Sequence, residues 1–130
     1  MDLGAYIGQT IKLHFGAYNQ GTDGVTAMYV DNVSLEVCQP PTRTPTPVTP
    51  TLTPPPTATA APMVCPEGLT NTGFETTSGW HIPATEYTAG YVGSPVHGGA
   101  RSLRLGIVNS GDNRYAYSAA NQEVAIPASA

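Results

Sequence analysis

Residues 39–64 read QPPTRTPTPVTPTLTPPPTATAAPMV, and this stretch decides how the rest of the chain is organised. It holds nine of the thirteen prolines, eight threonines and one charged side chain, Arg43. Proline removes a backbone donor, fixes φ and pushes the preceding residue toward an extended conformation. Such a segment favours polyproline II and buries too little apolar surface to offset the entropy cost of folding. The sequence therefore predicts a disordered linker, which would span roughly 80 Å if fully extended.

The linker leaves two flanks, residues 1–38 and residues 65–130. The first is shorter than a chain that usually forms a core unaided, and the second is marginal. Charged residues make up 11% of the chain and the net charge is −4, so no basic surface for nucleic acid is expected. No apolar run approaches the roughly 20 residues that span a bilayer, which argues against membrane insertion. The first ten residues lack the pattern of a signal peptide, and the linker favours a slice of a longer secreted protein over a cytosolic one.

Alternation of apolar and polar residues predicts β-strands in both flanks. Residues 11–18 place Lys12, His14, Gly16 and Tyr18 on the face opposite Ile11, Leu13, Phe15 and Ala17. A second strand is expected over about residues 26–37, with an inward set of Tyr29, Asp31, Val33, Leu35 and Val37. After the linker, residues 71–80 read as a short strand, a turn and the start of another strand. Residues 101–108 alternate, with Leu103, Leu105 and Ile107 inside, and residues 115–126 supply a last strand.

No stretch shows capped helical periodicity, so no helix is expected. Short strands separated by glycine-rich turns predict an all-β chain that forms a β-sandwich or jelly roll.

Asp31 is the most informative polar residue, because the alternation places its carboxylate on an inward face. A carboxylate there must be paired, hydrogen-bonded or bound to a metal. No lysine or arginine lies nearby in the sequence, so a structural calcium ion is one candidate, with Glu75 as the second carboxylate. The alternative is a carboxylate that accepts backbone N–H bonds at a sheet edge.

Two cysteines, Cys38 and Cys65, border the linker. Their spacing fits no metal or redox motif, and each lies where a disulfide would tie terminal strands together. A bond between them would contribute roughly 3 kcal/mol by closing the intervening loop. Two unrelated thiols are the alternative.

Catalytic patterns are not evident. The three histidines (His14, His81 and His97) fit no metal motif, no serine lies in a nucleophile-elbow context, and Glu75 with Glu86 carries no weight as a glycosidase pair without a pocket. The chain is therefore not expected to be an enzyme. Exposed aromatic rings offer a binding role instead, because aromatic faces stack on the apolar faces of sugars. The candidate ligand-binding residues are Trp80, Tyr87, Tyr115 and Tyr117. Trp80 follows a turn, where a tryptophan is more often a core residue than a ligand platform, and Tyr115 and Tyr117 share one strand face that either lines a surface or packs the sandwich.

Several motifs resemble galactose-binding-like jelly-roll modules, a family that includes many non-catalytic carbohydrate-binding modules. NTGFE (71–75) followed by Trp80, PVHGGARSLRLG (95–106) and QEVAIPA (122–128) look like the opening half of such a module. DLGAYIGQTIKLHFGAYN (2–19) and AMYVDNVSLEV (27–37) look like its closing half. The resemblance implies a structural calcium near Asp31 and Glu75, and it implies that each cysteine pairs with a counterpart at the far end of its own module. Sugar-contacting residues in this family vary and often come from middle strands that the chain lacks.

The sequence is thus interpreted as a slice through a tandem array. Residues 1–38 would be the C-terminal part of one module, 39–64 the linker, and 65–130 the N-terminal part of the next. The expected function is non-catalytic binding of a glycan or polysaccharide by a secreted or cell-surface protein, with neighbouring modules of the same protein as further partners. The alternative is a structural spacer or adhesin module that binds no sugar. A further hypothesis has the two flanks folding back on each other, with the Asp31 strand pairing against NTGFE. That would bring Cys38 near Cys65 and Asp31 near Glu75.

Overall fold

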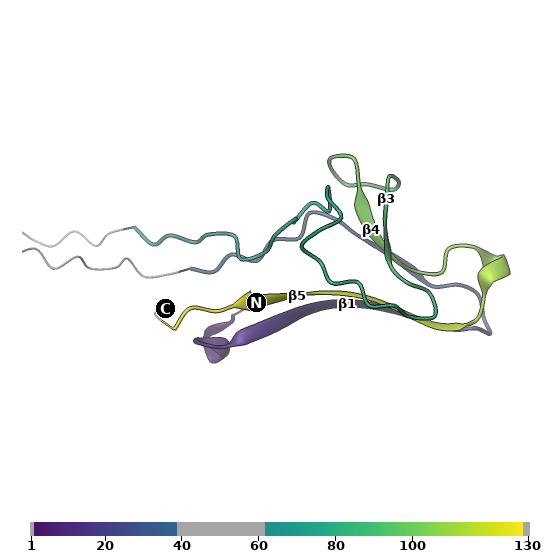
Figure 1. Cartoon of the computed structure of the whole chain (residues 1–130), viewed down its shortest axis with the longest axis horizontal. Coiled ribbons are helices and arrows are strands. Elements are labelled where there is room, and N and C mark those ends of the chain that lie inside the picture. Colours follow the sequence, from purple (N-terminus) through teal and green to yellow (C-terminus); the bar gives the residue numbers. More distant parts are fainter. Residues whose placement is uncertain (1, 39–61, 129–130) are drawn as a thin grey trace, which may run out of the picture.

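The computed structural model describes residues 2–38 and 62–128 (Figure 1). The predicted linker, residues 39–64, therefore lies outside the described residues except for its last three. The elements in chain order are the 3₁₀ turn η1 (Gly4–Tyr6), the strands β1 (Thr10–Gln20), β2 (Ala27–Val30), β3 (Gly90–Val92) and β4 (Ser102–Gly106), the 3₁₀ turn η2 (Ser110–Asp112) and the strand β5 (Tyr115–Ala125). The prediction of an all-β chain is confirmed. No helix of the described residues is long and apolar enough to cross a membrane.

The strands form two antiparallel sheets, and each sheet draws strands from both flanks. β1 and β5 pair along eleven residues, from Thr10 opposite Ala125 to Gln20 opposite Tyr115. The second sheet has the order β2-β4-β3. Figure 1 shows the long β1–β5 pair running along one side of the molecule, with β3 and β4 on the other. The two flanks therefore fold back on each other, which is the arrangement that the last sequence hypothesis required.

A single hydrophobic core lies between the sheets and joins both flanks. The expected inward residues of β1 pack against it, as do those of residues 103–107, where Leu103, Leu105 and Ile107 have no exposed surface. Phe74 and Trp80 stack with ring centroids 5.1 Å apart, and Phe15 lies 5.5 Å from Trp80. Large aromatic side chains dominate such cores because each buries a large apolar area. These three rings connect β1 to the segment that follows the linker.

The face assignment of the second predicted strand is wrong in its first half. β2 ends at Val30, its inward residues are Met28 and Val30, and Tyr29 is 39% exposed. Asn32 adopts a left-handed conformation with φ of 50°, which breaks the strand. The alternation is reset there, so that Val33, Leu35 and Val37 face the core as expected.

Residues 71–75 are also not a strand. Asn71 and Phe74 have positive φ values of 50° and 56°, so the backbone turns sharply twice and delivers the Phe74 side chain into the core. The Asp31 strand therefore does not pair with NTGFE as a ladder. The contact that remains is one hydrogen bond from the Val33 amide to the Thr72 carbonyl, 3.0 Å long.

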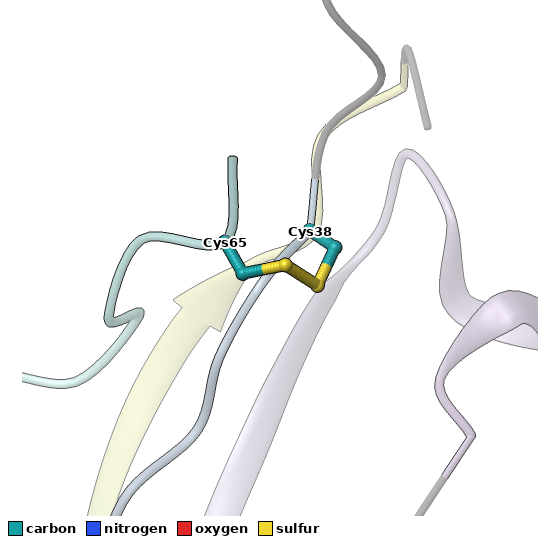
Figure 2. Close-up of a disulfide and its surroundings, with 2 residues drawn as sticks. All are labelled: Cys38 and Cys65. Carbon is teal, nitrogen blue, oxygen red and sulfur yellow. A yellow bond between two sulfur atoms is a disulfide. The ribbon is translucent and has the colours of Figure 1, made fainter. Parts of the chain in front are cut away.

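A disulfide joins Cys38 to Cys65, with an S–S distance of 2.06 Å (Figure 2). Beside it, residues 35–37 and 66–68 run antiparallel, with an isolated bridge between Glu36 and Glu67. The Val37 amide donates to the Pro66 carbonyl at 2.9 Å, and the Gly68 amide donates to the Leu35 carbonyl at 2.8 Å. The bond therefore closes a short backbone ladder that holds the two flanks together where each meets the linker.

Candidate functional site

The outward face of the β1–β5 sheet carries three exposed tyrosines. Side chains alternate between the two faces of a strand, so Tyr18 on β1 and Tyr115 and Tyr117 on β5 point to the side away from the core. Tyr18 lies directly opposite Tyr117, and Tyr115 lies opposite Gln20. Their exposed fractions are 46%, 66% and 37% for Tyr18, Tyr115 and Tyr117. We call these three residues and the adjacent His14 the tyrosine face.

The rings of the tyrosine face contact one another in pairs. Tyr18 and Tyr115 meet edge to face, with centroids 5.2 Å apart and planes at 89°. His14 and Tyr117 stack at 6.3 Å with planes 13° apart, and His14 Nε2 lies 2.6 Å from the Tyr117 hydroxyl. Each ring is thereby oriented by a neighbour, which reduces the entropy lost when a ligand orders it.

Gly16 makes room for this arrangement. A Cβ added there would lie 2.8 Å from the Tyr117 hydroxyl and 3.1 Å from His14 Nε2. The Tyr117 side chain therefore lies across the backbone of β1 at a position where only glycine leaves space. The Tyr115 side chain raises the pKa of Tyr18 above its ordinary value of 10.0, first through a hydrogen bond and then through desolvation and charge. The Tyr18 phenol is therefore neutral at physiological pH and available as a hydrogen-bond donor.

A polar groove of about 580 Å³ continues the same face toward the other end of β5. Asn121 lies in it and is the ladder partner of His14, so the groove begins where the tyrosine face ends. His81 enters from the segment alongside β5, where its backbone exchanges two hydrogen bonds with Asn121 of 2.8 and 2.9 Å. Lys12 and Glu123 form an exposed ion pair of 3.7 Å at its rim. The groove thus offers hydrogen-bond donors and acceptors beside the rings, together with one positively and one negatively charged side chain.

The four aromatic residues predicted to bind ligand are dispersed by the fold. Tyr115 and Tyr117 lie together on the tyrosine face. Trp80 is 6% exposed and its Nε1 donates to the Asn71 carbonyl at 3.1 Å, so it is a core residue, as one of the two sequence interpretations had it. Tyr87 lies elsewhere, in the loop before β3, with the guanidinium groups of Arg104 and Arg114 over its ring.

Tyr18 completes the face but is missing from the sequence-derived set. The signal was present, because the period of two already placed Tyr18 on the outward side of its strand together with His14. What the sequence lacked was the pairing of that strand with residues 115–125.

The two carboxylates predicted to hold calcium instead anchor one loop. Asp31 accepts hydrogen bonds from the amides of His97 (2.8 Å) and Gly98 (3.1 Å), and also from the amide of Asn32. Glu75 accepts hydrogen bonds from the amides of Ala100 (3.0 Å) and Arg101 (3.3 Å) in the same loop. Both carboxylates thus accept hydrogen bonds from the loop at residues 97–101.

The surroundings of Asp31 fit an anion that is satisfied by amides. Burial raises the pKa of Asp31, but hydrogen bonds from Gly98, His97 and Asn32 outweigh it and lower the pKa below its ordinary value. Amide hydrogens directed at these oxygens repel a cation, whereas calcium requires six to eight oxygen ligands. Among the described residues no group of three or more His, Cys, Asp or Glu could hold a metal ion. The hydrogen bonding of Asp31 and Glu75 therefore does not favour calcium, and the calcium site stays a prediction from the sequence.

Glu67 has a similar role beside the disulfide. It accepts hydrogen bonds from the amides of Leu35 and Leu69, each 2.9 Å, and from the Ser34 hydroxyl at 2.7 Å. Burial raises the pKa of Glu67, but these hydrogen bonds together outweigh burial, so the pKa lies below its ordinary value. Glu67 therefore links the two flanks through hydrogen bonds to its charged form.

Comparison with known proteins gives no match: no family model, no curated protein and no solved structure matches this chain significantly. The two antiparallel sheets are compatible with a β-sandwich, and the galactose-binding-like resemblance stays a prediction from the motifs.

Proposed function

We propose that the chain is a non-catalytic carbohydrate-binding segment of a secreted or cell-surface protein, built on a galactose-binding-like jelly roll. The observation that carries this proposal is the tyrosine face, in which three exposed phenol rings lie on one sheet surface beside a polar groove. Phenol rings present an apolar face to a sugar ring and a hydroxyl to its polar groups. The groove adds the amide of Asn121 and the charges of Lys12 and Glu123.

Two further features support this reading. Exposed aromatic residues gathered on one surface mark binding sites, because single scattered ones are common but groups are not. The disulfide fits the oxidising conditions outside the cell. The expected glycan is a polysaccharide chain long enough to lie along the sheet, since the tyrosines and the groove follow the strands.

Affinity electrophoresis and calorimetry against a panel of soluble polysaccharides would test the proposal on the full chain. Tyr18→Ala, Tyr115→Ala and Tyr117→Ala should each weaken binding by about tenfold, because centrally placed aromatic anchors contribute roughly 1–2 kcal/mol or more. Tyr6→Ala is the matched control: Tyr6 is also 46% exposed, but it lies in η1, away from this face.

The proposal would be rejected if no polysaccharide binds the disulfide-bonded chain, or if the three variants bind as well as the Tyr6→Ala control. The first outcome would favour the alternative function, a structural spacer or adhesin module without sugar binding. Far-UV circular dichroism of each variant separates lost binding from lost folding.

A further inference from the structure

Two arginines from different segments converge on Tyr87, outside the tyrosine face. The guanidinium carbon of Arg104, in β4, lies 5.0 Å from the Tyr87 ring centroid. That of Arg114, the residue before β5, lies 5.3 Å from the same centroid. The chain has only five lysines and arginines in total, and two of them meet at one phenol ring.

Neutral groups hold both arginines in place. Arg104 donates to the Tyr87 hydroxyl at 3.4 Å and to the Thr88 carbonyl at 3.2 Å. Arg114 donates to the Glu86 carbonyl at 3.1 Å. Carbonyl and phenol oxygens orient a guanidinium but leave its charge uncompensated. The loop at residues 86–88 therefore positions the two guanidinium groups, but the oxygens that bond to them do not neutralise their charge.

Among the described residues neither arginine of this cluster forms an ion pair; Glu86 lies in the loop, but Arg114 bonds to its backbone carbonyl and not to its carboxylate. In the described part of the chain the ion pair present is Lys12–Glu123, which lies in the polar groove. The chain has nine acidic residues, yet none forms an ion pair with Arg104 or Arg114. Arg104 Nε is moreover buried with no hydrogen-bond partner among the described residues. A half-buried guanidinium without a counterion is stabilised by an oxyanion that bonds to the N–H groups it still exposes.

We propose that Arg104 and Arg114, held by Tyr87, form a binding site for the oxyanion of an acidic glycan. Arginine presents a planar fork of donors that matches carboxylate and sulfate groups, and its stacking on a ring fixes the direction of that fork. The shared chemistry is a singly charged planar or tetrahedral oxyanion, supplied by a uronic acid carboxylate or by a sulfate ester. The identity of the rest of the ligand rests on the proposed function, whereas the oxyanion chemistry does not.

Binding to the full, disulfide-bonded chain would be measured by calorimetry at fixed ionic strength. The polymeric ligands are a uronic acid polymer, a sulfated polysaccharide and a neutral polysaccharide. Sodium sulfate and sodium glucuronate serve as small probes, and their binding is followed by the NMR chemical shifts of the arginine side chains. The preferred acidic polymer should bind more tightly than the neutral one. Arg114→Gln should weaken that binding by about tenfold, since charge-assisted hydrogen bonds are about twice as strong as neutral ones.

Arg101→Gln is the matched control, because it removes the same charge from an exposed arginine whose backbone belongs to the loop anchored by Glu75. It should leave acidic binding within about twofold of the parent chain, given the screening of exposed charges. Arg114 is exposed, so Arg114→Gln is expected to fold; Arg104→Lys, which keeps the charge but removes the fork, serves as a second variant.

Equal weakening by Arg114→Gln and Arg101→Gln would overturn the inference, because only net charge would then matter. Preference for the neutral polymer, with no effect of Arg114→Gln, would overturn it and leave the proposed function intact. Binding of sulfate or glucuronate that Arg114→Gln abolishes, without binding of any polymer, would support the oxyanion site and overturn the proposed function. No binding of any ligand would overturn both.

Discussion

The Tyr117 hydroxyl lies 2.6 Å from His14 Nε2, across a strand pair in which neither residue is the other's direct ladder partner. Tyr117 reaches this position by crossing the backbone at Gly16. The orientation of the most central ring of the tyrosine face therefore depends on a residue without a side chain.

Gly16→Ala is expected to reduce polysaccharide binding while leaving the fold intact. The new methyl group would displace the far end of the Tyr117 side chain, which can rotate into solvent at little cost in stability. Affinity should fall by about tenfold, comparable to the loss of one aromatic anchor. Gly111→Ala is the control, because a Cβ there meets nothing within 4 Å. Equal affinity of Gly16→Ala and Gly111→Ala would contradict the role assigned to Tyr117.

Acid should destabilise the protein through Asp31 and Glu67. Both have a pKa in the folded state below the ordinary values of 3.8 and 4.5, so each contributes stability that is present above those values. That stability is lost as the pH falls through the lowered folded-state pKa. Asp31→Asn should lower the free energy of unfolding at pH 7 by about 1 kcal/mol and flatten its decline in acid. Urea denaturation at a series of pH values from about 2 to about 7, a range that brackets the titration of both carboxylates, would measure the free energy of unfolding.

Asp23→Asn is the matched control for that experiment. Its carboxylate lies in an exposed turn and accepts a hydrogen bond from the neighbouring Thr22 hydroxyl only. If the free energy of unfolding of Asp31→Asn depended on pH in the same way as that of Asp23→Asn, the anchoring role of Asp31 would be contradicted.

Gly99→Ala should destabilise the loop that Glu75 anchors. Gly99 has a φ of 68°, which costs an alanine about 1–2 kcal/mol, and the added methyl group would collide with the Glu75 carboxylate. Combining Gly99→Ala with Glu75→Ala removes the collision but keeps the backbone strain. The double variant should therefore lose less than the sum of the two single variants, as measured by thermal unfolding. Strict additivity would mean that Glu75 does not lie over Gly99 in solution.

Removal of the disulfide should lower stability without changing the sheets. Cys38 and Cys65 are 27 positions apart, and opening that loop costs about 3 kcal/mol in the loop-entropy model. The Cys38→Ser, Cys65→Ser double variant should show this loss in chemical denaturation, while the β1–β5 amides keep their protection from hydrogen exchange near neutral pH. An unchanged denaturation midpoint would contradict the stabilisation that the loop-entropy model assigns to this disulfide.

Local pattern predicted the strands well where one face is buried throughout. Leu103, Leu105 and Ile107 follow the expected alternation, and so does Val124 in β5. The pattern was wrong at Tyr29, because the left-handed Asn32 shifts the alternation by one residue; asparagine tolerates this conformation, but a single Asn in an alternating run does not predict it.

Residues of the candidate site were harder to predict, since they depend on contacts between distant segments. Whether Trp80 faces a ligand or the core is decided by its stacking on Phe74 and Phe15, which arrive from both flanks. Tyr87 contacts Arg104, 17 positions away, and the neighbouring Glu86 carbonyl accepts from Arg114, 28 positions away. Periodicity describes one strand at a time, so such convergence becomes visible only once the sheets are assembled.

The pairing of Thr10 with Ala125 gives the β1–β5 sheet a defined mechanical response. A pull on the two ends of the chain would first load the hydrogen bonds that join Gly8 and Gln9 to Ile126 and then open the ladder from this pair onward, one residue pair after another, at low force. The covalent bond between Cys38 and Cys65 keeps the intervening residues out of the load path, so they would add no length on extension. Single-molecule stretching with and without reductant should differ by the contour length of that loop, and identical extensions would contradict this path of force.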